Sequence, residues 1–488
     1  MTTSQPQRGR TPSQLRVLMS GQPAGWLRRD EQGRVSLRYD TAYASSRTAT
    51  PLSIKLPLTE EEHRGRPLLA WLANLLPDND RVLARWAAKY QVSAGSPYAL
   101  LAHVGADCAG AVQFLREDQL EQVPQGGLTP LTDAEVGDLL RALAADPAAW
   151  TPLHEGGQFS LAGAQAKVAL HWDGQRWSEP WGREPSTHIL KPPMPSLAYQ
   201  EINEHLCLRI ARHLDLPAAS SQVRTIGGQQ VIAVERYDRI RAGDQLLRLH
   251  QEDLCQALGV MPANKYQAEG GPGAADIVSL LRRVMPATYA EAAIGTFLDA
   301  LALSWVLAAT DAHAKNYSLL LSGPAVRLAP LYDINSVLPY LTATRRGMSP
   351  GQVSTHSARL AMSIGGKARL DELDRTAWAS LATASRLPES TVLDRVTAVV
   401  EAVPAAAQAV LDEEGTAGQL TVDQQAFVEQ FHQQIDRRAG LCRNALLGRG
   451  PRVPRRTRRA PTPGAPRDDT QAMRSSGAES ASSDRNTA

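Results

Sequence analysis

TDAHAKN at positions 310–316, followed by LYD at 331–333, is the stretch that decides the fold of this chain. Asp311 and Asn316 lie five residues apart, directly after the long apolar run 297–309, and Asp333 follows seventeen residues after the asparagine. Phosphoryl transfer needs one Asp near the attacking hydroxyl, and an Asn with a second Asp to hold the metal that bridges the nucleotide phosphates. The spacing therefore predicts the catalytic half of a protein-kinase-like site.

Length and charge exclude some other classes. The chain has 488 residues, with 43% hydrophobic and 21% charged side chains, which suits two or three globular domains or one large bilobal enzyme. The net charge is +2, but residues 449–488 hold nine Arg and four acidic residues, so this tail carries +5 and the rest −3. The body is therefore not a nucleic-acid binder by charge alone.

The cysteines and the apolar runs indicate an intracellular setting. The four cysteines are widely separated and form no C-x-x-C pair, so we expect buried free thiols at Cys108, Cys207, Cys255 and Cys442. No apolar run approaches the roughly 20 residues of a membrane span. Residues 1–14 are polar and lack the apolar core of a signal peptide. We expect a cytoplasmic protein that makes no membrane contact.

Composition and periodicity divide the chain into six segments. A polar linker precedes a helix for which Thr132 is a good N-cap, and later strands and a helix follow the strand–strand–helix–strand order of a nucleotide-binding lobe. The segments are a disordered arm (1–14), a small α+β unit (15–116), the linker and helix (117–149), the nucleotide-binding lobe (150–238), a mostly helical lobe (239–447) and a disordered Pro/Arg/Ser-rich tail (448–488).

Lys191 ends a short apolar strand. A kinase needs a strand lysine that touches the phosphates and a Glu on the following helix to hold it. Taken alone, Lys191 is typical of a solvent-facing lysine at a strand end. The downstream set of Asp and Asn residues favours the phosphate-contacting lysine instead. Glu204 is the preferred partner, although Glu201 lies one turn away on the same helical face.

Three further segments have a functional and an ordinary interpretation. FSLAGAQAK at 159–167 has small residues that let backbone N–H groups approach phosphates, but it matches neither the Walker pattern nor GxGxxG and also suits a plain hairpin. VERYDR at 234–239 is either the hinge between lobes, reading adenine, or a charged strand exit. His313 lacks further ligands at zinc spacing and is expected to orient its loop. Lys315 either neutralises the transferring phosphate or is a solvated loop lysine.

Together these segments resemble the HipA family, the kinase toxins of bacterial toxin–antitoxin pairs. The matching segments are FSLAGAQAK (159–167), THILK (187–191), ERYDR (235–239), HQEDLCQALG (250–259), TDAHAKN (310–316), LAPLYD (328–333) and MSIGGK (362–367). Others are similar to the family's first subdomain: PLS (51–53), LPL (56–58), LLPD (75–78) and GADCAGAV (105–112). The resemblance covers roughly residues 15–447.

The resemblance implies an α+β, two-lobed protein-kinase-like fold, with a mixed α/β N-terminal lobe, an extra small N-terminal subdomain and a mostly helical C-terminal lobe. It implies phosphorylation of Ser or Thr with ATP and magnesium. The roles it assigns are catalysis by Asp311, magnesium binding by Asn316 and Asp333, and nucleotide contact by Lys191, by the phosphate-loop residues Ala162, Gly163, Ala164 and Gln165, and by the hinge residues Glu235 and Tyr237.

The resemblance also implies regulation and partners. Ser160 matches the position at which family members phosphorylate themselves, and a charge of roughly −1.5 to −2 there would repel ATP from the loop. The implied partner is a HipB-like helix-turn-helix antitoxin, through which alone the kinase meets DNA. The implied substrates are aminoacyl-tRNA synthetases, the glutamyl enzyme above all.

The chain departs from the usual family pattern at two places. Ala166 stands where many members carry an acid, and the Arg/Ser tail is additional; the tail is either a nucleic-acid contact or, as we favour, a solvated extension. Two other functions stay open. One is a corepressor scaffold that joins an antitoxin on operator DNA. The other is a small-molecule kinase, which is less favoured because Thr310 stands where such enzymes usually have His.

Overall fold

The computed structural model describes residues 11–59, 61–120, 126–146, 160–163, 165–243, 245–344, 348–417 and 420–449. All of these belong to one compact unit that spans residues 1–450. The expected tail lies outside the described residues except for 448–449, and the expected arm except for 11–14. Strand β1 begins at Gln14, next to the predicted start of the first subdomain.

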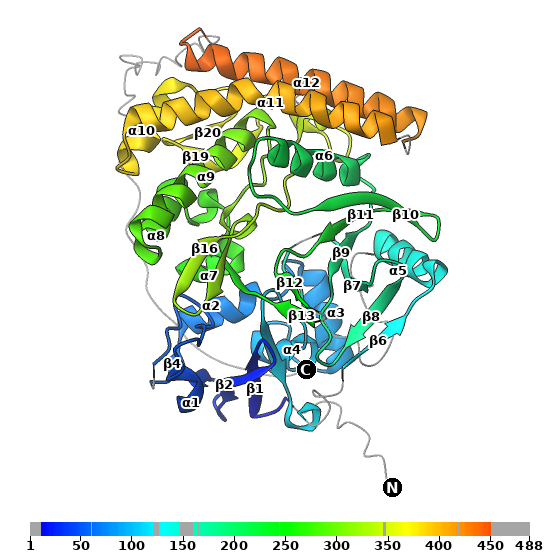
Figure 1. The fold of residues 1–488 in the computed structure, drawn as a ribbon, viewed down its shortest axis with the longest axis vertical. Coiled ribbons are helices and arrows are strands. Elements are labelled where there is room, and N and C mark those ends of the chain that lie inside the picture. The colour runs from blue at the N-terminus through cyan, green and yellow to red at the C-terminus, as the bar shows by residue number, and fades with distance from the viewer. Residues whose placement is uncertain are drawn as a thin grey trace, which may run out of the picture. The chain divides into compact units, whose positions relative to one another are not determined.

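The N-terminal subdomain is an antiparallel sheet covered by short helices (Figure 1). The sheet order is β4-β3-β2-β1-β5, with β1 (Gln14–Met19), β2 (Gln22–Arg29), β3 (Val35–Tyr39), β4 (His63–Arg64) and β5 (Val112–Leu115). The helices are α1 (Thr41–Ala44), α2 (Arg66–Asn74), α3 (Asp80–Tyr90) and α4 (Pro97–Val104). Trp71 of α2 packs edge-on against Phe114 of β5, and both are fully buried. The subdomain therefore has a core that joins its helices to its sheet.

A second, six-stranded sheet forms the next lobe. Its order is β10-β11-β9-β7-β8-β6, with β6 (Gly127–Pro130), β7 (Val168–Trp172), β8 (Trp177–Trp181), β9 (His188–Lys191), β10 (Ser221–Ile226) and β11 (Gln229–Glu235). Strand β6 and helix α5 (Asp133–Ala145) come from the segment 117–149, for which a linker and a helix were expected. Thr132 caps α5 with a capping box to Glu135, so the predicted helix and its cap are present. Strand β6, which was not predicted, adds an edge strand to this sheet.

Helix α6 (Gln200–His213) follows β9, and most of its side chains are buried. Ile202, Leu206 and Ile210 recur at helical spacing and face the core of the following lobe. A continuous apolar face at this spacing fixes the rotation of the helix. Glu204, one turn into the helix, is therefore held at a defined angle toward β9.

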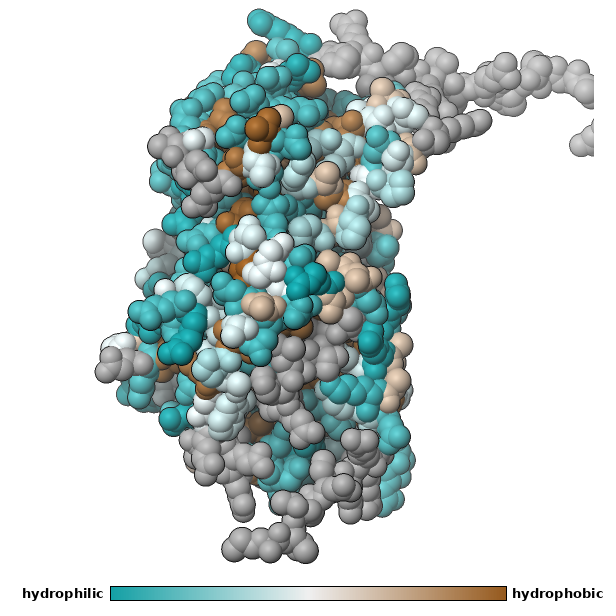
Figure 2. All heavy atoms as spheres, turned by 90° about the vertical axis from the view of Figure 1, so that its right-hand side faces the viewer, coloured by the Kyte–Doolittle hydropathy of each residue, from teal (hydrophilic) through white to brown (hydrophobic). Residues whose placement is uncertain are grey.

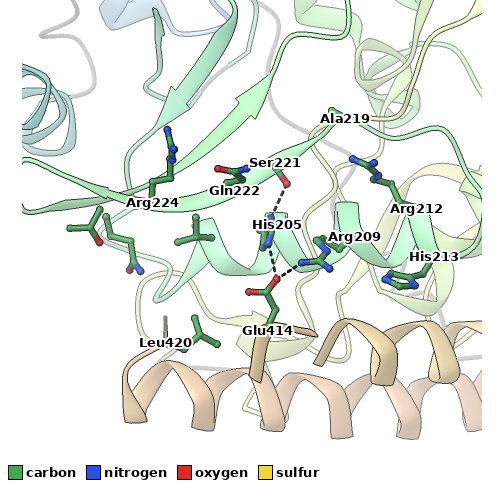
Figure 3. A pocket seen from close by; sticks show the side chains of 13 residues that line it. His205, Arg209, Arg212, His213, Ala219, Ser221, Gln222, Arg224, Glu414 and Leu420 are labelled. Carbon is green, nitrogen blue, oxygen red and sulfur yellow. Dashed lines mark hydrogen bonds and ion pairs between the residues drawn. The ribbon is translucent and has the colours of Figure 1, made fainter. Parts of the chain in front are cut away.

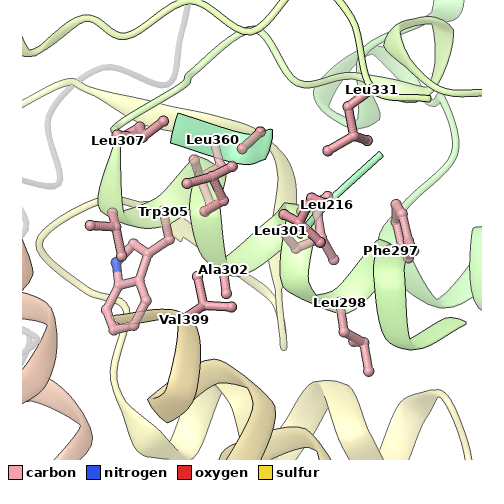
Figure 4. Close-up of a cluster of buried hydrophobic side chains, with 14 of the residues drawn as sticks. Leu216, Phe297, Leu298, Leu301, Ala302, Trp305, Leu307, Leu331, Leu360 and Val399 are labelled. Carbon is pink, nitrogen blue, oxygen red and sulfur yellow. The ribbon is translucent and has the colours of Figure 1, made fainter. Parts of the chain in front are cut away.

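The remaining lobe is mostly helical and is built around α9 (Figure 4). Phe297, Leu301 and Trp305 of α9 contact Leu216 and Val399 from elements far apart in sequence. Its helices are α7 (Leu254–Leu258), α8 (Ala274–Val284), α9 (Ala287–Val306), α10 (Arg375–Ala384), α11 (Glu389–Ala417) and α12 (Val422–Leu446). Helix α9 is apolar on nearly all sides, as expected for the centre of a core.

Short strands complete this lobe. Antiparallel sheets are formed by β14-β15-β16, by β12-β13 and by β19-β20, and a parallel pair by β17-β18. The strands are β12 (Arg239–Ala242), β13 (Gln245–Arg248), β14 (His250–Asp253), β15 (Ser318–Ser322), β16 (Ala325–Leu328), β17 (Leu341–Thr342), β18 (Val353–Ser354), β19 (Arg359–Ile364) and β20 (Lys367–Arg369). Because β15 leaves directly from residue 317, the sheet fixes the end of the TDAHAKN segment.

The surface and the thiols match an ordinary globular protein. One face carries mostly hydrophilic side chains with apolar ones scattered among them (Figure 2). The four cysteines are buried and unpaired, which confirms the sequence-based expectation. Among the helices that the structure describes, none is long and apolar enough to cross a membrane.

A buried group of charges joins the N-terminal subdomain to the segment after β11. We call it the hinge ion cluster, and its members are Asp107, Arg236, Asp238, Arg239 and Arg248. Each side chain is less than a tenth exposed. The cluster therefore fixes the subdomain against the segment after β11 through charge-assisted hydrogen bonds with little solvent screening.

Candidate active site

A cavity of about 500 Å³ opens between the lobes. Its walls come from segments far apart in the chain, among them Asp78 of the N-terminal subdomain, the loop around Gly163, and the segment 310–316 with Asp333. A volume of this size lies within the range of sites that hold small molecules. The structure thus brings the two halves of the predicted site to one space.

Asp311 is the accessible carboxylate of this cavity. Its side chain is 59% exposed, whereas the side chains around it are largely buried. The Asn316 side-chain nitrogen donates a hydrogen bond of 2.8 Å to the Asp311 carbonyl oxygen and closes the loop. That contact uses the Nδ2 atom of Asn316, so the Oδ1 atom is left to accept a hydrogen bond or to ligate a cation.

His313 lies inside the loop and is largely buried. Its Nε2 atom is 4.0 Å from Asp311 Oδ1, and its Nδ1 atom is buried without a hydrogen-bond partner. Burial lowers the pKa of His313, so the ring is neutral at pH 7. No group of three or more candidate metal ligands of the His, Cys, Asp or Glu type occurs within the described residues.

Lys315 takes a position that neither expectation anticipated. It is only 4% exposed, so it is not a solvated loop lysine. Its Nζ atom donates to Asp78 Oδ1 at 2.9 Å and to Asn74 Oδ1 at 3.0 Å. The lysine therefore ties the TDAHAKN segment to the N-terminal subdomain, and its charge is already neutralised by Asp78.

Lys191 connects the two lobes at the back of the cavity. Its Nζ atom donates to Glu204 Oε1 at 2.7 Å and to Asp333 Oδ1 at 3.0 Å. Glu204 and not Glu201 makes this contact; the Glu201 carboxyl is buried elsewhere with one oxygen unpartnered. Burial raises the pKa of Asp333, but the charges of Lys191 and Lys167 outweigh it and lower the pKa to about 2. Asp333 is thus ionised at neutral pH.

The loop with Gly163 forms the opposite wall. Ala162, Gly163 and Gln165 line the cavity, and Ala164 lies outside the described residues. Gly163 has φ +107°, and a Cβ atom there would lie 2.4 Å from the Nζ atom of Lys167. Because Lys167 could move aside, it is the positive φ that favours glycine here, which is typical of a loop that brings backbone close to a ligand.

Lys167 is a site residue that the sequence reasoning missed. Its Nζ atom donates to the Ala162 carbonyl at 2.6 Å. Burial, with a smaller contribution from the charge of Lys191, lowers the pKa of Lys167 to about 8. It is the last residue of the FSLAGAQAK motif, but nothing in the spacing distinguishes it from a solvated lysine.

Ser160 is at the base of the loop and has no access to the cavity. It is fully buried, its Oγ atom donates to the Leu75 carbonyl at 2.8 Å, and its N–H donates to the Asp107 carbonyl at 2.8 Å. Both acceptors belong to the N-terminal subdomain. The phosphate loop is therefore fastened to that subdomain through the same residue that the resemblance marks as a phosphorylation site.

Glu235 and Tyr237 are not brought to this cavity. Glu235 ends β11 and is exposed, and both residues line a second space of about 440 Å³ beside Pro217. The intervening Arg236 turns inward to the hinge ion cluster, which directs its neighbours away. Tyr237 reaches the site only indirectly, by stacking on Tyr332 with ring centroids 5.8 Å apart.

Another cavity, of about 1000 Å³, is lined by residues of α6, β10 and α11, and its lining includes neither Asp311 nor Asp333 (Figure 3). His205 contacts both Ser221 and Glu414, and Arg209 also pairs with Glu414 (Figure 3). These contacts tie α6 to α11 and so support the helix that carries Glu204. Because the space is distant from Asp311, we assign the chemistry to the smaller cavity.

The comparisons with known proteins agree with this geometry. The HipA-like C-terminal domain matches residues 159–407, which is half of the chain, and the HipA N-terminal domain matches residues 15–115. The protein Y4mE of Sinorhizobium fredii is 35% identical over 440 residues, covering 88% of this chain and 99% of that protein. The chain belongs to the HipA family of serine/threonine kinase toxins.

Other HipA relatives extend the match. The serine/threonine-protein kinase toxin HipA of Shewanella oneidensis is 28% identical over 399 residues, covering 79% of this chain and 86% of that protein. A solved structure of HipA from Shewanella oneidensis MR-1, in complex with HipB and operator DNA, superposes with a TM-score of 0.74 at 24% identity, covering 89% of this chain and 97% of that chain. This confirms the predicted α+β, two-lobed protein-kinase-like fold.

Three further residues of the site come from outside the family motifs quoted for catalysis. Asp78 accepts hydrogen bonds from Lys265 and Lys315, both at 2.9 Å. The Tyr266 hydroxyl donates a hydrogen bond to the Asp311 carboxylate. Asp78 is part of the LLPD segment, whose resemblance implied only a subdomain. Lys265 and Tyr266 lie in an aperiodic stretch between helices, where the sequence offers no spacing signal.

Proposed function

We propose that this HipA-family chain transfers the γ-phosphoryl group of ATP to a serine or threonine of a protein, with magnesium, as the toxin of a toxin–antitoxin pair. The observation that carries the proposal is the contact of Lys191 with both Glu204 and Asp333 beside Asp311 and Asn316. Phosphoryl transfer depends on positioned charge, and this arrangement supplies it from both lobes.

The residues present fit the nucleotide and the metal. Gly163 lets the loop adopt the positive φ with which its backbone lines the cavity, and Lys191 and Lys167 place positive charge near it. The Asn316 amide oxygen and the Asp333 carboxylate are hard oxygen ligands of the kind magnesium prefers. When bound, magnesium would supply neutralisation of the phosphate charge.

The chain's own residues divide the remaining work. Asp311 would orient the acceptor hydroxyl and accept its proton, because it is the exposed carboxylate of the cavity. Glu204 and Asp333 hold the Lys191 ammonium from two sides, so its position does not depend on the ligand. Lys315 fixes the loop that carries Asp311 and Asn316 rather than meeting the phosphate.

Replacing Asp311 by Ala tests the activity. We expect phosphate transfer from ATP to a protein acceptor to fall by at least about 10³-fold at saturating ATP and magnesium, with unchanged unfolding temperature. Asp394→Ala, at an exposed position of α11, is the matched control and should stay active. Activity that survives Asp311→Ala would refute the assignment.

We propose in addition that phosphorylation of Ser160 silences the kinase. The contacts of Ser160 support the silencing step, because a phosphate with roughly two negative charges cannot stay against the Leu75 and Asp107 carbonyls and would release the loop. Intact-mass spectrometry after incubation with ATP should show one added phosphate that is missing in Ser160→Ala, and that variant should be at least as active. Phosphate only at other positions would contradict the proposal.

The proposed partner is a small HipB-like helix-turn-helix antitoxin, and the proposed location is the cytoplasm. The support is that the related Shewanella HipA was solved with HipB and operator DNA. We expect this chain to meet DNA only through the antitoxin, so a gel shift with operator DNA should need both proteins. Binding by this chain alone at physiological salt would favour a scaffold that contacts DNA itself.

For the substrate we propose an aminoacyl-tRNA synthetase, with the glutamyl enzyme as the first candidate. The support is the family resemblance. Thiophosphate labelling in a lysate of the host, with Asp311→Ala as the blank, should label a synthetase. Labelling of other proteins alone would refute the choice of substrate while leaving the kinase activity intact.

A further inference from the structure

Tyr266 is hydrogen-bonded through its hydroxyl to Asp311, the carboxylate that would orient the acceptor hydroxyl of the substrate. Its Oη atom donates a hydrogen bond of 2.5 Å to Asp311 Oδ1, and its ring meets His313 edge-on with centroids 4.8 Å apart. Burial, and then the hydrogen bond and charge of Asp311, raise the pKa of Tyr266 well above its usual value. The phenol therefore keeps its proton and acts as a donor.

The fold holds this tyrosine in place from both sides. Lys265 donates to Asp78 at 2.9 Å, and the side-chain oxygen of Gln267 accepts the backbone N–H of Ser363 at 2.7 Å. The backbone N–H of Gly271 donates to the Tyr266 carbonyl at 2.9 Å, and a Cβ atom at Gly271 would lie 2.1 Å from the Asn264 carbonyl. The hydroxyl is thus presented by a tight loop anchored to two different parts of the molecule.

The position of this hydroxyl is the one that an acceptor needs. A general base must lie within about 2.6–3.2 Å of the oxygen whose proton it takes. Tyr266, Asp311, Asn316 and Asp333 all line the same cavity, so the phenol sits on the side of Asp311 that faces the reaction space. A substrate hydroxyl that approaches Asp311 Oδ1 from the cavity along the same lone pair can donate only after the phenol has moved away.

We propose that Tyr266 stands in for the acceptor hydroxyl in the free protein and that the serine or threonine of the substrate displaces it. This inference rests on the proposed kinase function. It adds that the Tyr266 phenol competes with the substrate hydroxyl for Asp311. The phenol keeps Asp311 oriented while disfavouring acceptors that bind too weakly to displace it. The side of the cavity around Gly163 is untouched, so nucleotide binding should not depend on Tyr266.

Kinetics of full-length Tyr266→Phe tests the displacement. With dephosphorylated casein as the probe acceptor, removing one hydrogen bond to a charged group should lower the KM for casein by about ten- to a hundredfold. The kcat and the KM for ATP should stay within about twofold, a margin well below the effect of one such bond. Tyr289→Phe, on the exposed part of α9, is the matched control. A higher KM for casein, or a tenfold drop in kcat, would show that Tyr266 assists the acceptor and would overturn the proposal.

A second measurement does not depend on activity. 3-Fluorotyrosine at position 266 should give a ¹⁹F resonance that moves in Asp311→Asn and again when casein saturates the protein, whereas the same label at position 289 should not move. A resonance at 266 that ignores either change would overturn the proposal. A third outcome separates the two proposals: neither wild type nor Tyr266→Phe transfers phosphate, but the resonance does move. That result would refute the proposed kinase function and would still support the contact between Tyr266 and Asp311.

Discussion

The hinge ion cluster and the lysines of the active site are two buried sets of charge with different chemistry. The hinge uses three arginines, and each guanidinium contacts carboxylates or backbone carbonyls at several points, as Arg239 does with Asp107 and the Gly110 carbonyl. The site uses lysines instead: Lys167, Lys191, Lys265 and Lys315. Each ammonium contacts one to three groups around a cavity, as Lys191 does with Glu204 and Asp333.

The difference teaches how one chain separates rigidity from reactivity. A guanidinium is a planar fork whose hydrogen bonds fix geometry, whereas an ammonium is a compact charge that can change partners. Where two lobes must keep one arrangement, the chain has arginine. Where a phosphate is expected to enter, it has lysine. We therefore expect mutations in the hinge to lower stability and mutations in the site to lower activity.

The largest effect is expected in the hinge. Asp107→Asn removes the carboxylate shared by Arg236, Arg239 and Arg248 and leaves their charge buried with too few partners. We expect a loss of about 3–5 kcal/mol in the free energy of unfolding, measured with urea. The control is Asp138→Asn, which breaks an exposed ion pair on α5. It should lower the free energy of unfolding by less than about 1 kcal/mol. A similar loss in both variants would remove the distinction between the clusters.

The next effect is expected in the site. Lys191→Arg keeps the charge but places a larger fork between Glu204 and Asp333, where the Nζ contacts are 2.7 and 3.0 Å. We expect kcat/KM for ATP to fall about 100-fold while the unfolding temperature changes little. Lys89→Arg, at an exposed position of α3, should have no effect. Full activity of Lys191→Arg would show that only the charge matters here.

The smallest effect concerns a buried carboxyl with no cation. Glu252 accepts the Ile54 N–H at 2.8 Å, its Oε2 atom has no partner, and burial raises its pKa to about 8. The folded state holds a proton that the unfolded chain releases near pH 4.5, so stability is full below pH 4.5 and falls as the pH rises toward 8. Glu252→Gln should flatten this decline and stabilise by about 1–2 kcal/mol at pH 8. Urea unfolding at pH 5 and pH 8 would measure it, and parallel curves for both proteins would contradict the expectation.

Motif spacing predicted the parts of the site that lie close in sequence. The Asp311–Asn316 spacing and the later Asp333 pointed to one cavity, and the helix after Lys191 placed Glu204 at the correct turn. These features depend on local periodicity and on a few residue types that the chemistry requires. The same reasoning located Thr132 as a helix cap, because a cap is decided within four residues.

The parts that could not be predicted depend on contacts between distant segments. Lys315 meets Asp78 across 237 positions, so its burial cannot be read from its own loop. Tyr266 lies in a loop without periodicity, and the inward turn of Arg236 moves Glu235 away from the cavity. No pattern within one element carries this information, since it arises only when the lobes are packed.

The attachment of the N-terminal subdomain bears on how the chain can be divided. The two family domains meet between residues 115 and 159, which looks like a natural place to cut. Yet the Asp78 N–H donates to the Gly163 carbonyl, Leu75 accepts from Ser160, and the Asp78 side chain holds Lys315. Both the loop that would cradle phosphate and the loop that carries Asp311 are thus braced from the same side. The boundary between the two family domains in the sequence does not separate two independent units in the folded enzyme. Residues 160–447 alone would form a kinase domain that lacks the contacts supporting both loops.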